Sequence, residues 1–451
     1  MPNGARRGYT ARRMNSTPIR KTVSLCPVCR RRLPADVVEA DGSVYMEKDC
    51  PEHGHFRSRI GKYPRYYREL MELYRLLAEH FPYRRDRIES CAFTTTLRCN
   101  MSCPICFAAD EGRVMPPEMP LAEIREKLKP LRGRGINFKL TGGESTVRDD
   151  LGEIVAMIRA SGNFPVMVTN ARRLDDLEYL QSLADRGLYA VAPWFDTTDS
   201  DGIYETMRGE PLLGQREKVL ENVRRAGLKL IIFFVCARGV NDDQLPGILA
   251  LTRSRPELFK INVMGYMHRG SRGFGRENEY LADELWDAVV ASSAVFSSPD
   301  ELFTALKINL ISRAVRRIYH CFNSQTVLMP RSDRREDGFD LEKWDGIVRR
   351  FREMLPGDPG RARRFFLRRF AGDLFRMGFS RPLARRFIPG RKELADTFIP
   401  PGYYWLQFQC MYYPENYDEE MVREFCPYPS FNPGLEKRVS FCEYYNLGLK
   451  T

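Results

Sequence analysis

The stretch that decides the fold is Cys99-Asn100-Met101-Ser102-Cys103-Pro104-Ile105-Cys106, which places three cysteines in one short loop. Cysteine thiolate is the soft ligand that holds iron–sulfur clusters, and a [4Fe–4S] cluster normally takes four of them. Because this loop offers three, one iron would keep an open position for a small chelating molecule. The alternatives are a zinc knuckle that lacks a ligand, or three cysteines of an ordinary core. The spacing therefore predicts an iron–sulfur site with room for a second ligand.

The composition is that of an ordinary soluble protein. The 451 residues are 43% hydrophobic and 29% charged, which is enough for a large core and predicts two or three domains. The first twenty residues lack the apolar segment of a secretory signal, and no apolar run approaches the ~18 residues of a membrane span. We therefore expect a cytoplasmic protein whose clustered cysteines bind metal. The net charge of +12 fits an anionic partner without choosing between nucleic acid and a lipid surface.

The pattern along the chain predicts five regions. They are a basic disordered tail over 1–22, a metal-binding knuckle unit over 23–62, a linker helix over 63–89, a parallel α/β barrel over 90–300, and a C-terminal basic helical and auxiliary-cluster α+β domain over 301–451.

The knuckle unit carries the spacing of a zinc ribbon or a rubredoxin. Cys26, Cys29, Cys50 and His53 form a C-x2-C…C-x2-H pattern around a predicted hairpin turn at 41–42. Two such knuckles can close a tetrahedron around one ion, which makes a structural site without an open position. We predict one mononuclear zinc or iron here, with His55 as the alternative fourth ligand.

The region from about 90 to 300 alternates short β-rich runs with amphipathic helical patterns, which is typical of a parallel α/β barrel. Six strands are predicted, at 91–96, 136–141, 165–170, 188–195, 228–236 and 259–265. In parallel barrels the active site lies at the carboxyl ends of the strands. The residues directly after each strand are therefore the candidates for function.

The residues at these strand ends resemble the motifs of the radical SAM superfamily. The three-cysteine loop follows the first strand, and Gly142-Gly143-Glu144 follows the second, like the family's GGEP motif with Ser145 in place of proline. Asn170 follows the third strand, like the family's TNG. The resemblance implies a partial (β/α)6 barrel and a [4Fe–4S] cluster that binds S-adenosylmethionine. It also implies that the cluster passes one electron to S-adenosylmethionine and leaves a 5′-deoxyadenosyl radical, which takes hydrogen from a substrate. The two glycines, the glutamate and the asparagine are then cofactor-binding residues.

Three further residues are candidates by the same resemblance. Asp196 and Arg208 stand at the spacing of the family's FD…YxxxRG pattern. Asp196 is a candidate for binding a ribose hydroxyl or for acid–base catalysis, and Arg208 for binding a carboxylate. A helix cap or a structural ion pair is the alternative for each. His268 follows the sixth strand and is a catalytic candidate, with an ordinary surface histidine as the alternative.

Residues 349–391 are unusually basic and aromatic. On a helix one apolar stripe is formed by Phe366, Phe370, Leu374 and Met377. Arg361, Arg364 and Arg368 lie on another face. A basic amphipathic helix can bind an anionic membrane surface. The alternative is that the stripe packs on the barrel and the arginines face water.

The C-terminal region also supplies cysteines that are far apart in the sequence. We predict that Cys321, Cys410, Cys426 and Cys442 hold a second, auxiliary [4Fe–4S] cluster, with buried ordinary thiols as the alternative. Two further cysteines lie in predicted barrel strands, and we interpret them as core residues. They are Cys91 and Cys236.

The order of these parts resembles the tetraether lipid synthase group, including a terminal FCxYxN stretch at 441–446. Members join lipid alkyl chains, and a relative is assigned to pterin methylation. The resemblance implies a lipid or other apolar substrate, with radical methylation of a pterin or other small molecule as the alternative. It also implies an electron donor such as ferredoxin or flavodoxin. Peripheral attachment at the inner face of the membrane fits the lipid substrate.

Tetraether synthase carries two auxiliary clusters, whereas the remaining cysteines here support one. The non-enzymatic alternative is a basic, metal-stabilised nucleic-acid or interaction protein, which would not need the ordered strand-end motifs. Nucleic acid is therefore not an expected partner.

Overall fold

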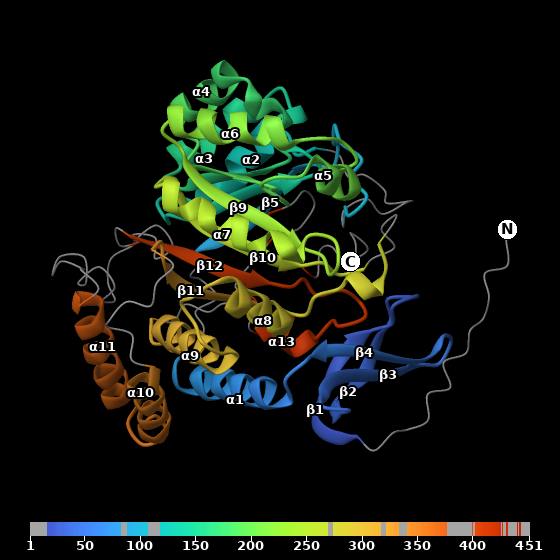
Figure 1. Ribbon diagram of the computed structural model, residues 1–451, viewed down its shortest axis with the longest axis vertical. Coiled ribbons are helices and arrows are strands. Elements are labelled where there is room, and N and C mark those ends of the chain that lie inside the picture. Colours follow the sequence, from blue (N-terminus) through green and yellow to red (C-terminus); the bar gives the residue numbers. More distant parts are fainter. Residues whose placement is uncertain are drawn as a thin grey trace.

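A computed structural model describes residues 16–82, 88–106, 118–268, 274–316, 322–332, 341–376, 399, 402–424, 426, 430–431, 440 and 442. Two sheets organise this part of the chain, an N-terminal sheet of four strands and a larger sheet of eight. The N-terminal sheet lies beside the larger sheet at the side toward which strands β9 and β10 point (Figure 1).

The N-terminal sheet is an antiparallel ribbon in the order β1-β2-β3-β4. Its strands are β1 (Thr17–Leu25), β2 (Arg32–Ala40), β3 (Ser43–Cys50) and β4 (Gly54–Gly61). The predicted hairpin turn is confirmed, because Asp41 and Gly42 adopt the positive φ values of 50° and 70° that a tight two-residue turn requires. The predicted tail is too long, since β1 begins at Thr17 and pairs along its whole length with β2. Residues 1–15 lie outside the described residues.

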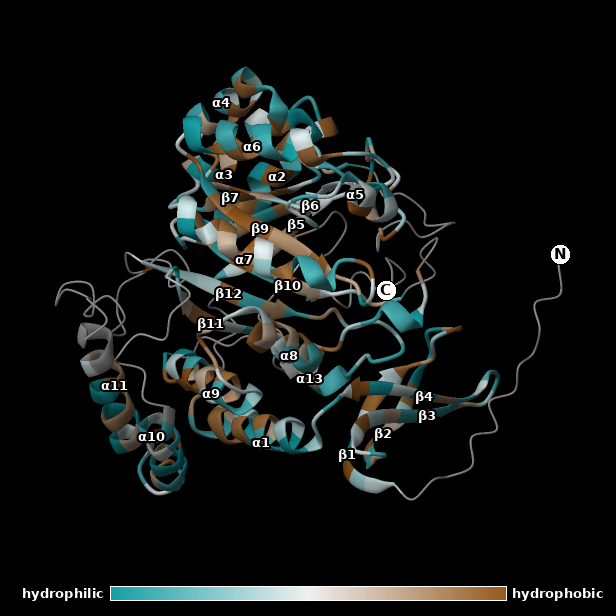
Figure 2. Ribbon diagram, viewed as in Figure 1, coloured by the Kyte–Doolittle hydropathy of each residue, from teal (hydrophilic) through white to brown (hydrophobic). Residues whose placement is uncertain are grey.

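The larger sheet has the strand order β11-β12-β10-β9-β8-β7-β6-β5. The six predicted strands are present as β5 (Ser90–Thr96), β6 (Asn137–Gly142), β7 (Phe164–Thr169), β8 (Ala190–Pro193), β9 (Lys229–Cys236) and β10 (Leu258–Gly265). All six are parallel. Strand β9 is almost entirely hydrophobic in Figure 2, as expected for a parallel strand that is covered on both faces.

Two strands beyond residue 300 extend the sheet, so this part of the C-terminal region is not a domain apart from the barrel, contrary to what the sequence predicted. Strand β12 (Tyr403–Gln409) runs parallel to β10, and β11 (Ser324–Pro330) runs antiparallel to β12. At the opposite edge, Ser430 forms a bridge with Ala92 of β5, and Phe431 N donates to Ala92 O at 2.6 Å. Residues from beyond 400 therefore flank both edges of the barrel sheet.

Most of the helices up to residue 314 lie over one face of the larger sheet. The helices in this part of the chain are α1 (Pro64–His80), α2 (Leu121–Leu128), α3 (Leu151–Ala160), α4 (Leu177–Asp185), α5 (Asp201–Arg208), α6 (Leu213–Arg225), α7 (Leu245–Ser254), α8 (Ala282–Ser292) and α9 (Pro299–Ala314). The exception is α5, which lies near the carboxyl ends of the strands (Figure 1). Helix α1 is part of the core rather than a linker, because the ring of Tyr66 lies 4.5 Å from that of Phe303 on α9. A short helix, α13 (Glu419–Glu424), follows β12.

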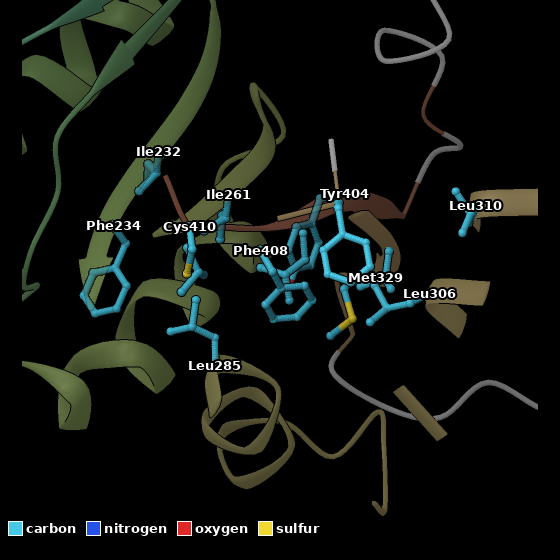
Figure 3. Close-up of a cluster of buried hydrophobic side chains, with 14 of the residues drawn as sticks. Ile232, Phe234, Ile261, Leu285, Leu306, Leu310, Met329, Tyr404, Phe408 and Cys410 are labelled. Atoms are coloured by element: carbon cyan, nitrogen blue, oxygen red, sulfur yellow. The ribbon is translucent and has the colours of Figure 1, made fainter. Parts of the chain in front are cut away.

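The two faces of the larger sheet differ in what they contact. Phe234 on β9 and Phe408 on β12 belong to the large core beneath the helices, together with Leu285 of α8 (Figure 3). The alternate positions of the strands, among them Phe233 and Met264, form a separate cluster on the other side. We call this second side of the sheet the inner face.

The basic region forms a helical hairpin of α10 (Leu341–Met354) and α11 (Pro359–Arg376). Phe366 is buried and its ring lies 5.5 Å from that of Phe351 on α10. The arginines 361, 364 and 368 are exposed. The described part of the stripe therefore packs inward, because Phe366 contacts α10 and belongs to the large core. Met377 lies outside the described residues. Figure 1 shows the hairpin at the end of the sheet opposite the carboxyl ends of the strands. None of the described helices is both long enough and apolar enough to cross a bilayer.

Candidate active site and ribbon metal centre

The ribbon gathers four metal-ligand atoms into one group. The thiols of Cys26, Cys29 and Cys50 and a ring nitrogen of His53 all lie within 4.8 Å of one another. The Cys29 and Cys50 sulfurs are 3.9 Å apart, and His53 Nδ1 is 3.4 Å from Cys50 Sγ. A tetrahedron with metal–ligand bonds of about 2.0–2.3 Å has edges near this length. His55 lies outside the group and pairs with Asp49. The geometry therefore selects His53 as the fourth ligand over His55.

The electrostatics of the ribbon favour a bound cation. Burial opposes ionisation of Cys50, but hydrogen bonds from His53 and from the backbone of Glu52 lower the pKa of this thiol to about 6. A thiol that ionises below neutral pH is prepared for a metal, because thiolate is the form that coordinates.

In the barrel, the glycine motif after β6 fixes the backbone of the cysteine loop. Gly143 N donates to Thr96 O at 2.9 Å, and Glu144 N donates to Arg98 O at 2.8 Å. A Cβ atom at Gly143 would stand 2.2 Å from Arg98 O, and one at Gly142 would stand 2.0 Å from Thr96 O. Glycine is required at both positions because the two loops touch through their backbones.

The carboxylate of Glu144 is buried and joins the ends of two strands. Oε1 accepts from Thr146 N at 3.0 Å and from Thr169 Oγ1 at 2.8 Å, and Oε2 accepts from Asn170 N at 2.6 Å. Burial raises the pKa of this carboxyl, and the hydrogen bonds oppose the shift. Among the described residues Oε2 has a single partner, so this oxygen can accept a further hydrogen bond from a bound ammonium.

Asn170 connects the end of β7 to the cysteine loop. Its Nδ2 donates to Asn100 Oδ1 at 2.7 Å and lies 3.9 Å from Cys99 Sγ. The next residue, Ala171, adopts a left-handed backbone with φ 64°. This conformation favours glycine, which explains the glycine of the motif that this stretch resembles. The predicted cofactor-binding residues 142–144 and 170 therefore lie together around the loop.

Asp196 and Arg208 form a buried, two-point ion pair. Arg208 Nε donates to Oδ2 of Asp196 at 2.6 Å, and Arg208 Nη2 donates to Oδ1 at 2.7 Å. Helix α5 ends at Arg208 because Gly209 follows with a left-handed φ of 87°. This geometry matches the alternative of a structural ion pair, and both carboxylate oxygens of Asp196 already have a partner.

The same ion pair lies beside the cysteine loop. Burial raises the pKa of the Cys103 thiol, and the Arg208 guanidinium opposes this shift through its charge and a hydrogen bond. The loop offers three thiols, Cys99, Cys103 and Cys106, of which Cys99 is exposed and the other two are half-buried. Three thiolates can each bind a different iron of one cluster. The soft donor set therefore fits an iron–sulfur cluster.

His268 lies just beyond the end of β10, at the mouth of the barrel. Its backbone N donates to Glu279 Oε1 at 2.9 Å, and its ring Nδ1 lies 3.4 Å from the hydroxyl of Tyr266. Burial raises the pKa of Glu279. The sequence did not single out Glu279, because it lies in a loop and belongs to no motif.

The C-terminal cysteines do not all support an auxiliary cluster. Cys410 points to the helix-covered face of the sheet, beside Phe234 and Leu285 (Figure 3). Burial raises its pKa to about 12, which is the behaviour of a core thiol. Cys426 is half-buried and Cys442 is buried. Cys321 lies outside the described residues, and the auxiliary cluster remains a prediction. The core positions predicted for two other thiols, Cys91 and Cys236, are confirmed.

Comparison with known proteins now identifies the barrel. Residues 93–252 match the family model of the Radical SAM superfamily. The barrel is a radical SAM domain. A radical SAM domain implies a [4Fe–4S] cluster and S-adenosylmethionine, in agreement with the donor set of the loop. Residues 18–61 match the HMPTM N-terminal zinc ribbon domain, which agrees with the ligand group of the ribbon.

Curated relatives of this radical SAM domain act on heterocycles, as their names state. The 7,8-dihydro-6-hydroxymethylpterin dimethyltransferase of Methanocaldococcus jannaschii is 32% identical over 256 residues, which are 51% of this chain and 49% of the relative. The GTP 3′,8-cyclase of Helicobacter pylori is 26% identical over 194 residues, 42% of this chain and 60% of the relative. The matches thus cover about half of each chain. The solved structure of Streptococcus suis SuiB bound to S-adenosylmethionine aligns with a TM-score of 0.37 and 15% identity, covering 46% of this chain and 47% of SuiB.

Proposed function

We propose that this protein is a radical SAM enzyme that modifies a nitrogen heterocycle of the pterin class, by methylation or a related transfer. The observation that carries the proposal is the cysteine loop after β5, which the ends of β6 and β7 hold through Gly143, Glu144 and Asn170. Three thiols of which one is exposed and two are half-buried would not need this support for a purely structural role. When bound, the cluster supplies one electron that cleaves S-adenosylmethionine into methionine and a 5′-deoxyadenosyl radical, which abstracts hydrogen from the substrate.

The residues of the chain have separate tasks in this proposal. The loop thiols Cys99, Cys103 and Cys106 hold the cluster. The Glu144 carboxylate orients the amino group of S-adenosylmethionine, since one of its oxygens has capacity for a further donor. Arg208 is a positioning residue, because Asp196 fixes its guanidinium beside Cys103. His268 stands at the mouth as a group that can exchange a proton with the substrate.

The substrate proposed here differs from the lipid that the sequence analysis preferred. That preference depended on a basic amphipathic helix that would bring the enzyme to a membrane. The described part of the apolar stripe of this helix packs inward, and the hairpin lies far from the carboxyl ends of the strands (Figure 1). The named substrates of the relatives are a pterin and GTP, and both are polar heterocycles. These observations support a heterocycle over an alkyl chain.

Isotope transfer tests the proposal. Reconstituted protein is incubated without oxygen with reductant, S-adenosylmethionine and either deuterated 7,8-dihydro-6-hydroxymethylpterin or deuterated phospholipid. We expect deuterium in 5′-deoxyadenosine from the pterin, and no product from the Cys103→Ala variant. Deuterium from the phospholipid alone would overturn the choice of substrate, and the absence of 5′-deoxyadenosine in every reaction would overturn the enzyme class.

Two further cofactor assignments belong to this proposal. The ribbon holds one zinc ion as a closed structural site, because its four donors leave no open position. A second cluster would use Cys426, Cys442 and Cys321, and a ferredoxin or flavodoxin would supply the electrons. Loss of about four irons per chain in Cys442→Ala, measured after reconstitution, is the expected result for a [4Fe–4S] cluster. An unchanged iron count would remove the second cluster from the proposal.

A further inference from the structure

A row of polar side chains crosses the inner face of the sheet over three neighbouring strands. Asn262 on β10 is paired with Gln407 on β12, which is in turn paired with Thr326 on β11. On the other side, Asn262 is paired with Phe233 of β9. Cross-strand neighbours point to the same face, so all four side chains share the inner face.

The row is buried, yet its hydrogen bonds are incomplete. Asn262 is fully buried, and Gln407 and Thr326 are each 5% exposed. Among the described residues, Asn262 Oδ1, Gln407 Oε1 and Thr326 Oγ1 have no hydrogen-bond partner, and neither has Trp405 Nε1 two positions before Gln407. Buried polar atoms in native proteins are almost always paired, so four such atoms in adjacent rows need an explanation.

The unpaired atoms are nevertheless held in place. Asn262 Nδ2 donates to Gln409 Oε1 at 2.9 Å, and Gln407 Nε2 donates to Ser324 Oγ. One end of each amide is therefore anchored by a neighbour, while the other end stays free. Binding sites have this arrangement, because polar groups that are fixed in advance lose little entropy when a ligand arrives.

The surroundings of the row suit a planar ring. The Phe233 ring lies 5.1 Å from that of Trp194, and the two form an apolar wall next to Asn262. The free atoms offer amide oxygens as acceptors, an indole N–H as a donor, and a hydroxyl that can do both. A heterocycle with an amino group and a lactam, as in a pterin or a purine, carries the complementary donors and acceptors on one edge.

We infer that Asn262, Gln407, Thr326 and Trp405 form the recognition surface for the amino-lactam edge of a nitrogen heterocycle. This inference rests on the proposed function for the reaction that follows, but binding itself needs neither reductant nor S-adenosylmethionine. It also explains why the sequence keeps amides at positions where a barrel strand ordinarily has apolar residues.

Equilibrium binding of 7,8-dihydro-6-hydroxymethylpterin and of GTP to the full chain, measured by calorimetry without reductant, tests the inference. Asn262→Leu and Gln407→Met keep the shape of each side chain and remove its amide. We expect at least tenfold weaker binding of the heterocycle that the unaltered protein binds. We also expect a melting temperature close to that of the unaltered protein, because each substitution removes an unpaired amide oxygen together with the hydrogen bond that the amide nitrogen donates to Gln409 or Ser324. The matched control is Gln325→Met, since Gln325 is a buried glutamine whose Oε1 also lacks a partner within the described residues but whose register places it on the opposite face. It should bind as the unaltered protein does.

Two results would overturn the inference. One is unchanged binding in both variants, which would mean that ordered water satisfies the row. The other is a clearly lower melting temperature together with unchanged binding, which would make the row structural.

Formation of 5′-deoxyadenosine in the absence of substrate separates this inference from the proposed function. Protein that binds the heterocycle but never cleaves S-adenosylmethionine refutes the function and supports the recognition surface. Protein that cleaves S-adenosylmethionine but binds neither heterocycle refutes the surface and the pterin-class substrate, and leaves the radical SAM chemistry standing. Protein that binds the heterocycle equally well in both variants refutes the surface alone.

Discussion

The two cysteine sites of this chain are supported in opposite ways. In the ribbon, four donors that lie between residues 26 and 53 meet within 4.8 Å and complete a tetrahedron by themselves. In the barrel, one loop supplies three thiols, and groups from other strands, such as Glu144 and Asn170, fix that loop. A site that closes locally stabilises the fold, whereas a site that takes its support from a distance can leave a coordination position open for chemistry.

The strongest test of this contrast is Cys103→Ala. The loop has no spare thiol, so we expect loss of about four irons per chain and no detectable 5′-deoxyadenosine. The measurement is an iron count and product analysis after anaerobic reconstitution. Cys91→Ala is the control, because Cys91 is buried in β5 away from the loop and should keep both iron and cleavage. If Cys103→Ala still cleaves S-adenosylmethionine, the loop does not hold the catalytic cluster and the contrast between the two sites is wrong.

Cys29→Ser tests the other half of the contrast. Removing one of four donors should release the single ribbon metal and lower the melting temperature by at least about 5 °C, since 1 kcal/mol corresponds to about 2–4 °C in domains of 150–250 residues. The iron of the barrel should stay. His55→Ala, outside the ligand group, should change neither quantity. Loss of barrel iron in Cys29→Ser would show that the two sites depend on each other.

Gly143→Ala tests whether support from β6 matters to the barrel site. The new methyl group would stand 2.2 Å from Arg98 O, so the cysteine loop has to move, at a cost of about 1–3 kcal/mol or more. We expect the variant to hold less iron and to lose at least part of its cleavage of S-adenosylmethionine. The ribbon should keep its single metal ion. Gly214→Ala in α6 is the matched control, because nothing lies within 4 Å of its added Cβ. Equal iron content in both variants would contradict the role of the glycine.

A pH experiment tests the junction between the two regions. Burial raises the pKa of Asp283 on α8 to about 6, and its Oδ2 accepts from the backbone N of Lys62 and Tyr63 at 2.6 and 2.9 Å. A carboxyl with a raised folded-state pKa binds its proton more tightly when folded, so its contribution to stability is complete below pH 3.8 and is lost as pH rises through 6. Asp283→Asn keeps an acceptor for both donors and removes the titration.

We compare the unfolding free energies of Asp283→Asn and the unaltered protein. Between pH 4 and pH 7 the unaltered protein should lose up to about 3 kcal/mol of stability relative to the variant. Denaturant unfolding across this range measures it. A difference that does not depend on pH would show that the carboxyl titrates normally. Cleavage of S-adenosylmethionine should be the same in both proteins, because Asp283 does not contact the cysteine loop.

The parts of the site that could be predicted are those that a strand end brings together. Glu144 and Asn170 were predicted because parallel strands place their carboxyl ends side by side, and the 2.6 Å bond between them confirms the placement. A structural ion pair was one alternative for Asp196 and for Arg208, beside a helix cap and the functional roles. The sequence spacing puts both residues near the mouth without showing which way each side chain points, so the pairing of the two was not predicted.

The features that could not be predicted depend on how strands far apart in the sequence pair with each other. Strand β12 pairs with β10 across more than a hundred residues, and no local pattern signals a parallel partner at that distance. The face of Cys410 could not be predicted for the same reason, since a shift of one residue would turn its side chain to the inner face. The polar row of Asn262 and Gln407 exists only once β10 and β12 are in register.

The bridge between Ala92 and Ser430 has a consequence for how the protein is made. At a synthesis rate of about 5–20 residues per second, residue 430 leaves the ribosome roughly 20 to 70 seconds after β5. During that interval β5 is a bare strand edge, and such edges pair readily with other chains. Strand β12 arrives almost as late at the β10 side. The edges of the barrel sheet are therefore covered only after residue 430 has been synthesised, and slow synthesis or premature arrest after residue 300 should leave a chain that aggregates rather than a smaller folded enzyme.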